Sequence, residues 1–90
     1  MQETLGNLSD RDPERYALLR AYIIQAAEQW CKEYFKQSSA QVCEVGDVPV
    51  AYPGDVFGYR VVVEMPDYPQ RELIEILIAP DSSTKGQHIL

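Results

Sequence analysis

The sequence has few of the residues that a catalytic or metal site needs. It contains one histidine, His88, and two cysteines, Cys31 and Cys43, among 90 residues. The two cysteines follow neither a CxxC nor a zinc-ligand spacing, and a histidine without an oriented partner is a poor general base. A glycine-rich phosphate loop is also missing. We therefore predict a protein that is not an enzyme and that needs no metal or cofactor.

Basic residues are scarce as well. Eight Lys and Arg stand against fourteen Asp and Glu, which gives a formal net charge of -6. This balance disfavours binding to a phosphate backbone and to an anionic membrane surface. No apolar run reaches the roughly 18 residues that a membrane helix needs, and the first ten residues contain no signal-peptide core. We expect a cytoplasmic protein that binds neither nucleic acid nor membrane.

The N-terminal half carries a strong helical pattern. A length of 90 residues suits a single domain, residues 1–90. Asp12 is a favourable N-cap and Pro13 suits the first helical turn, so we predict a loose leader over residues 1–11 and a helix over residues 12–38. The apolar arc of this helix is wider than the roughly 100° of a surface helix. Its flank either consists of aromatic rings with solvated polar tips or contacts a second chain.

After residue 40 the apolar period changes from 3.6 to 2, which is typical of strands. Three alternating runs are separated by the turn sequences YPGD and PDYP. They predict a three-stranded antiparallel meander over residues 42–79, followed by a mobile tail over residues 80–90. The predicted fold class is α+β, with one long N-terminal helix packed on this β-meander.

Charges set the register of the second and third predicted strands. Placing Arg60 opposite Glu75 also places Glu64 opposite Arg71, because antiparallel partners share a face. A shift by one residue would place Glu64 opposite Glu72 and turn the isoleucines away from the helix. Both paired glutamates then lie on the outer face, where they fix the register and limit aggregation. An unpaired buried carboxylate is costly, so Glu75 must be exposed or paired.

The first turn sets a second register. A pairing about Pro53 and Gly54 places Val50 opposite Phe57 and so puts Val50 on the helix face, together with Val48. A type II Pro-Gly turn suits a tight hairpin poorly, and a wider loop would shift this pairing.

The segment VEMPDYPQREL resembles part of the RWD domains, which are non-catalytic relatives of ubiquitin-conjugating enzymes. That resemblance covers the turn and its flanks only. The chain departs from the pattern at Leu73, where a further proline is usual, and at the later helical part. We assign no family and transfer no function from it.

The surplus apolar surface indicates a role in binding other proteins. We predict a small acidic non-catalytic protein that acts as a protein-interaction or regulatory subunit and self-associates, most simply as a homodimer. The candidate interface residues lie on the helix flank and on the outer sheet face: Tyr22, Trp30, Val62, Leu73 and Leu77. Two alternatives are an acidic inhibitor that mimics nucleic acid in a basic groove, and a small thiol enzyme that uses Cys31 or Cys43. The partner and any small-molecule ligand stay open.

Overall fold

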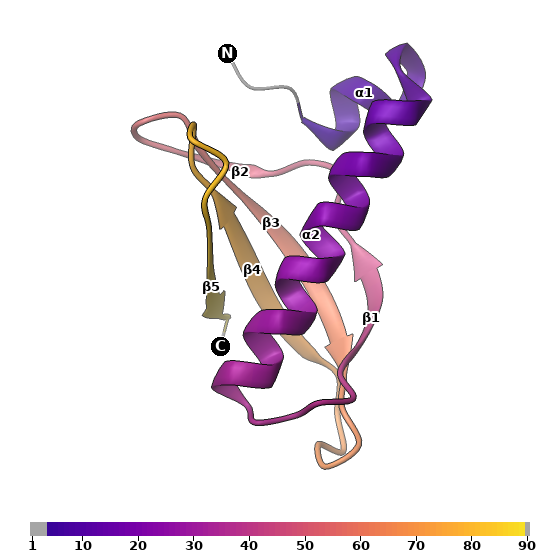
Figure 1. Ribbon diagram of the computed structural model, residues 1–90, viewed down its shortest axis with the longest axis vertical. Coiled ribbons are helices and arrows are strands. Elements are labelled where there is room, and N and C mark those ends of the chain that lie inside the picture. The colour runs from indigo at the N-terminus through magenta and orange to yellow at the C-terminus, as the bar shows by residue number, and fades with distance from the viewer. Residues whose placement is uncertain (1–3, 90) are drawn as a thin grey trace.

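The computed structural model describes residues 4–89, which form an α+β fold (Figure 1). Two helices, α1 and α2, lie across one face of a five-stranded antiparallel sheet. The elements follow in the order α1 (Leu5–Arg11), α2 (Pro13–Tyr34), β1 (Gln41–Val45), β2 (Val50–Tyr52), β3 (Val56–Glu64), β4 (Glu72–Ile78) and β5 (Thr84–His88). The predicted fold class is confirmed. The predicted detail of one helix and three strands is wrong, because α1 and β5 add regular structure at the two ends and the first predicted strand is divided into β1 and β2.

Helix α2 begins where its sequence predicts. The Asp12 side chain accepts a hydrogen bond from the Arg15 backbone N–H at 3.2 Å, and Pro13 occupies the first turn. The helix ends at Tyr34, before the predicted boundary at residue 38. Lys36 takes a positive φ of 59° just beyond the C-cap, and such a left-handed residue terminates many helices.

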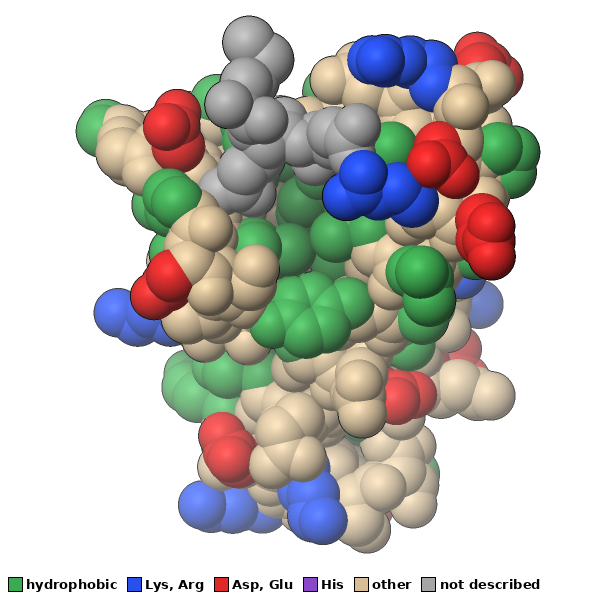
Figure 2. Space-filling view, turned by 45° about the horizontal axis from the view of Figure 1, so that its top comes forward, with side chains coloured by type: hydrophobic (Ala, Val, Ile, Leu, Met, Phe, Trp, Pro, Cys, Tyr) green, Lys and Arg blue, Asp and Glu red, His purple; other side chains and the backbone are tan. Residues whose placement is uncertain are grey.

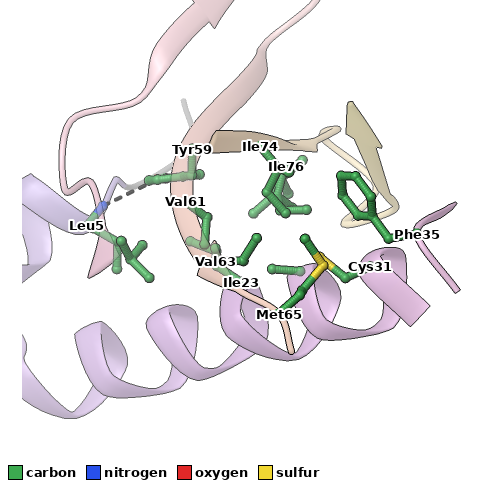
Figure 3. Close-up of a cluster of buried hydrophobic side chains, with 13 residues drawn as sticks. Leu5, Ile23, Cys31, Phe35, Tyr59, Val61, Val63, Met65, Ile74 and Ile76 are labelled. Carbon is green, nitrogen blue, oxygen red and sulfur yellow. Dashed lines mark hydrogen bonds between the residues drawn. The ribbon is translucent and has the colours of Figure 1, made fainter. Parts of the chain in front are cut away.

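The predicted leader is wrong over residues 5–11, which form α1. The Thr4 hydroxyl oxygen accepts a hydrogen bond from the Asn7 N–H at 3.2 Å and caps this helix. Leu5 and Leu8 are buried, and the Leu5 N–H donates to the Tyr59 hydroxyl at 3.3 Å (Figure 3). Helix α1 is therefore part of the core. Residues 1–3 lie outside the described residues.

The predicted mobile tail is also wrong where it is described. Strand β5 pairs antiparallel with β4, from Ile78 opposite Thr84 to Ile74 opposite His88. The Ile89 N–H extends this pairing by donating to the Leu73 carbonyl at 3.0 Å. The segment is polar, so it shows no alternating pattern of apolar residues that would predict a strand. It is held in place by backbone hydrogen bonds to β4. Residue 90 lies outside the described part.

Strands β1 and β2 form one interrupted edge of the sheet, because both pair with β3. The chain leaves the sheet between them at residues 46–49. There the Asp47 carbonyl accepts from the Gly6 N–H at 3.0 Å, and its carboxylate accepts from the Tyr16 hydroxyl at 3.1 Å. The interruption thus ties the sheet edge to both helices.

The core lies between α2 and the inner face of the sheet (Figure 3). The helix contributes Ile23, Ala27 and Cys31, all fully buried. The central strands contribute the alternating residues that face them: Tyr59, Val61, Val63, Ile74, Ile76 and Ile78. This period-2 pattern on β3 and β4 leaves every second side chain on the opposite face of the sheet.

Candidate functional site

The face of the sheet that points away from the helices is the candidate site. None of the helices and strands described in residues 4–89 lies over it (Figure 1). We call it the outer face and define it by the side chains that share it in the strand registers: Gln41, Glu44, Val50, Tyr52, Val56, Gly58, Arg60, Val62, Glu64, Leu73, Glu75, Leu77, Lys85 and Gln87.

The predicted register of the central strands is confirmed. Arg60 pairs with Glu75, and Val62 pairs with Leu73. Beyond the last ladder pair, the Arg71 Nε lies 3.1 Å from Glu64 Oε2. Opposite charges on neighbouring strands therefore select the pairing, as the sequence indicated.

The predicted register of the first hairpin is wrong by one residue. Residues 53–55 form a three-residue loop, with positive φ at Gly54 and Asp55. Such a loop is wider than the two-residue turn assumed from Pro-Gly. Val50 therefore lies opposite Gly58 on the outer face instead of opposite Phe57 on the helix face. Its neighbour Val48 lies outside any strand and is 84% exposed.

Glu75 occupies the centre of the outer face and is nevertheless fully buried. The Tyr52 hydroxyl donates to Glu75 Oε1 at 2.8 Å, and the Gln87 side-chain amide donates to the same oxygen. The Arg60 Nε lies 3.9 Å from Oε2. Side chains from β2, β3 and β5 thus close over a carboxylate on β4, and we call these four residues the Glu75 cluster. We expected Glu75 to be either exposed or paired, and the structure shows that it is buried and paired.

Gly58 makes room for this cluster. A Cβ atom at residue 58 would lie 2.5 Å from Glu75 Oε2 and 2.9 Å from the Tyr52 ring. Oε2 still has no hydrogen-bond donor among the described residues. The hydrogen bond to Glu75, helped by desolvation and by the carboxylate charge, raises the pKa of Tyr52. The tyrosine therefore stays a neutral donor at physiological pH.

Three aliphatic candidates flank the Glu75 cluster. Val62, Leu73 and Leu77 are each half-buried on the outer face, as predicted. Val62 and Leu73 are direct cross-strand partners, whereas Leu77 lies beyond Glu75 on the same strand, so apolar and charged side chains alternate along β4. Their role in binding stays a prediction.

Of the two helix-flank candidates, Trp30 is partly covered by the chain itself and Tyr22 remains exposed. The Tyr22 hydroxyl donates to the Ser82 carbonyl at 2.5 Å, although its ring remains 41% exposed. The Trp30 ring lies against β5 so closely that a Cβ at Gly86 would be 2.4 Å from it. Strand β5, which sequence reasoning missed, therefore accounts for much of the wide apolar arc of α2.

The residues considered for catalysis are separated. Cys31 is buried in the core, and burial, with a smaller contribution from Glu28, raises the pKa of its thiol to about 11. Cys43 is exposed on the bulged edge strand β1, and both thiols are free. No group of three His, Cys, Asp or Glu within residues 4–89 is arranged to bind a metal ion.

His88 packs into the fold although it lies near the C-terminus. It is half-buried in β5, where its Nε2 lies 3.5 Å from Glu72 Oε2. Its ring meets that of Phe35 edge-on, with centroids 5.2 Å apart. The strand pairing of β5 brings this histidine under the end of α2 and gives it a structural role.

No protein-family model matches the chain, and no curated protein or solved structure is significantly similar to it. Among residues 4–89, neither helix combines the length and the apolar character needed to cross a membrane. The function must therefore be inferred from the residues of this chain alone.

Proposed function

We propose that this chain is a small non-catalytic protein-interaction subunit that binds its partner through the outer face. The observation that carries the proposal is the fully buried Glu75 at the centre of a face that no described element covers. A solvated sheet face normally presents polar side chains that need no burial. Here side chains from three other strands form hydrogen bonds or an ion pair with one carboxylate. The half-buried Val62, Leu73 and Leu77 flank it.

The outer face fits this role better than the helix flank does. On α2, Trp30 packs against β5 and Tyr22 is hydrogen-bonded to the β4–β5 turn. On the outer face, Val62 and Leu73 are direct cross-strand partners, and Leu77 lies on the other side of Glu75 along β4. The outer face therefore presents half-buried apolar side chains with no described element over them, whereas Trp30 on the helix flank is already packed against β5.

A nucleic-acid mimic has less support. Such a mimic presents carboxylates that are spaced along one surface like phosphates. On the outer face Arg60 and Arg71 stand beside Glu75 and Glu64. Another side of the molecule likewise shows basic and acidic side chains interspersed (Figure 2).

A thiol enzyme also has less support. A nucleophilic cysteine needs an accessible and electropositive setting. Cys31 is buried, and its raised pKa keeps the thiol protonated at neutral pH. The Cys43 sulfur lies 3.7 Å from the carboxylate of Glu64, which is the wrong charge for an activating neighbour.

Capture of partners from the source cells tests the proposal. Tagged wild-type chain is compared with Leu73→Arg on the outer face and with Gln25→Arg, a matched control on the exposed side of α2. We expect the bound proteins, including further copies of the chain, to be lost with Leu73→Arg and kept with Gln25→Arg. Retention with Leu73→Arg and loss with Gln25→Arg would place the interface on the helix instead.

A further inference from the structure

We propose that the partner on the outer face is a second copy of this chain, related by a twofold axis that runs along the strands between β3 and β4. This inference rests on the proposed function and names its partner. Two sheets that pack face to face keep their strands nearly aligned, and most homo-oligomers are closed twofold dimers. The charge pattern of the outer face then decides where the axis lies.

Charges of alternating sign surround the Val62–Leu73 pair at the centre of β3 and β4. Four residues stand at the corners of this pattern: Arg60 and Glu64 on β3, and Glu75 and Arg71 on β4. Along β3 the positive corner precedes the negative one. Each corner faces the opposite sign across the strands, as the two intrachain ion pairs record.

A twofold axis along the β3–β4 boundary places β3 of one copy over β4 of the other. Residues that are cross-strand partners within one chain then meet again between chains. Arg60 lies over the position of the buried Glu75 of the second copy, and the central Val62 meets its Leu73. At the other end of the pattern, Glu64 meets Arg71. An axis along a diagonal of the pattern would instead stack like charges, which is unfavourable.

An axis across the strands would also pair opposite corners, but Glu44 argues against it. In the β1–β3 register Glu44 lies opposite Val62, so it shares the central row of the outer face. An axis across the strands through this row would place Glu44 of one copy on Glu44 of the other. The axis along the strands places it over the position of Ile89, which extends β5 beside Leu73.

One carboxylate oxygen of the Glu75 cluster lacks a hydrogen bond within the described part of the single chain. Glu75 Oε2 has no hydrogen-bond donor among the described residues. The nearby Arg60 is half exposed, with 51% of its side chain accessible. Oε2 is fully buried and is approached by Arg60 of its own chain, whose guanidinium carries five N–H donors. Covering this half-exposed arginine with a second copy favours its closer approach to Oε2 and so lowers the residual cost of the buried carboxylate.

The size of the face predicts weak association. Four strand positions at about 4.8 Å by seven or eight residues at about 3.3 Å give a projected area on the order of 500 Å² per chain. This lies towards the lower end for specific interfaces, at which affinities are commonly micromolar. The dimer is therefore expected to form progressively as the concentration is raised.

Sedimentation equilibrium over about 10 to 500 µM chain, with reductant present, tests the inference. The wild type is expected to show a monomer–dimer equilibrium. Glu64→Arg and Arg71→Glu should each weaken the dimer at least about tenfold, because both symmetric rim contacts become repulsive. An equimolar mixture of the two variants should restore it as a heterodimer, since position 64 of one chain then meets the opposite charge at position 71 of the other.

Glu33→Arg, the same charge change at an exposed position of α2, is the control and should leave the equilibrium unchanged. Circular dichroism of each variant confirms that the fold is kept. A monomeric wild type, a dimer insensitive to Glu64→Arg, or a mixture that fails to restore association would each overturn this dimer. Binding of other proteins through the outer face would still be decided separately by the capture experiment with Leu73→Arg.

Discussion

The Tyr52 hydroxyl donates a 2.8 Å hydrogen bond to Glu75 across the width of β3. Strand β2 pairs only with β3 in the described sheet, so this contact links the interrupted edge of the sheet directly to β4. It forms only because residue 58, between the two side chains, is a glycine. The three-residue loop at residues 53–55, the glycine at position 58 and the Tyr52 side chain together allow the Glu75 carboxylate to be buried.

The hydrogen bond between Tyr52 and Glu75 should contribute measurably to stability. Tyr52→Phe is expected to lower the free energy of unfolding by about 1.5–3 kcal/mol, as for hydrogen bonds to charged groups. In a Glu75→Leu background the same change should cost nearly nothing, so a double-mutant cycle in urea should give a coupling about equal to the whole effect of Tyr52→Phe in the wild type. Tyr34→Phe, at a 57% exposed ring, is the control. Additive effects of the two changes would contradict the linkage.

Stability should fall at alkaline pH. Burial raises the pKa of the Cys31 thiol from 9.0 to about 11 and raises that of Tyr59, and the hydrogen bond to Glu75 raises that of Tyr52. The unfolded chain therefore loses these protons first, so the stabilisation is complete below about pH 9 and is lost as the pH rises through the folded-state pKa values. Urea unfolding at pH 7, 9, 10 and 11 measures this. Tyr52→Phe should flatten the decline above pH 10, and a stability that is constant or rising over this range would refute the assignment.

The close contact between Trp30 and Gly86 predicts a size limit at β5. Gly86→Ala would place a methyl group 2.4 Å from the indole ring, so we expect a loss of about 1–3 kcal/mol from overpacking. Trp30→Leu should relieve part of this cost, giving a non-additive double mutant. Gly46→Ala, whose Cβ would make an ordinary 3.5 Å contact, is the matched control. Equal effects of the two glycine substitutions would show that Trp30 does not pack on β5.

Helix α1 should stabilise the domain. Leu5 is fully buried, and Leu5→Ala is expected to cost about 2–4 kcal/mol through lost burial and the cavity left behind. Asn7→Ala, at an exposed position of the same helix, should change stability by less than about 0.5 kcal/mol. Thermal and urea unfolding of both variants provide the measurement. If Leu5→Ala were as mild as Asn7→Ala, α1 would be only loosely attached.

The central hairpin was predictable because two independent signals agree there. Alternating apolar residues fix the faces of β3 and β4, and the opposite charges of Arg60 and Glu75 fix the pairing. The first hairpin had only the Pro-Gly dipeptide to indicate its turn, and a three-residue loop shifts every pair by one. The same shift hid the Glu75 cluster, since it moves Tyr52 onto the outer face.

The two ends of the chain were missed for different physical reasons. Helix α1 has seven residues and buries only two leucines, too few to produce a clear helical period. Strand β5 is polar and contains Gly86, where the β-propensity is low. It is held by backbone pairing to β4 and by the Trp30 ring, and both are tertiary contacts that no local pattern contains.

Site-specific photo-crosslinking in the source cells tests the central claim most directly. A photoreactive residue is placed at position 73 on the outer face or at position 25 on the exposed side of α2, so that only the surface differs. A docking role for the outer face predicts discrete crosslinked species from position 73, including a species of twice the chain mass if the partner is a second copy, and few from position 25. Abundant adducts from position 25 with none from position 73 would contradict it.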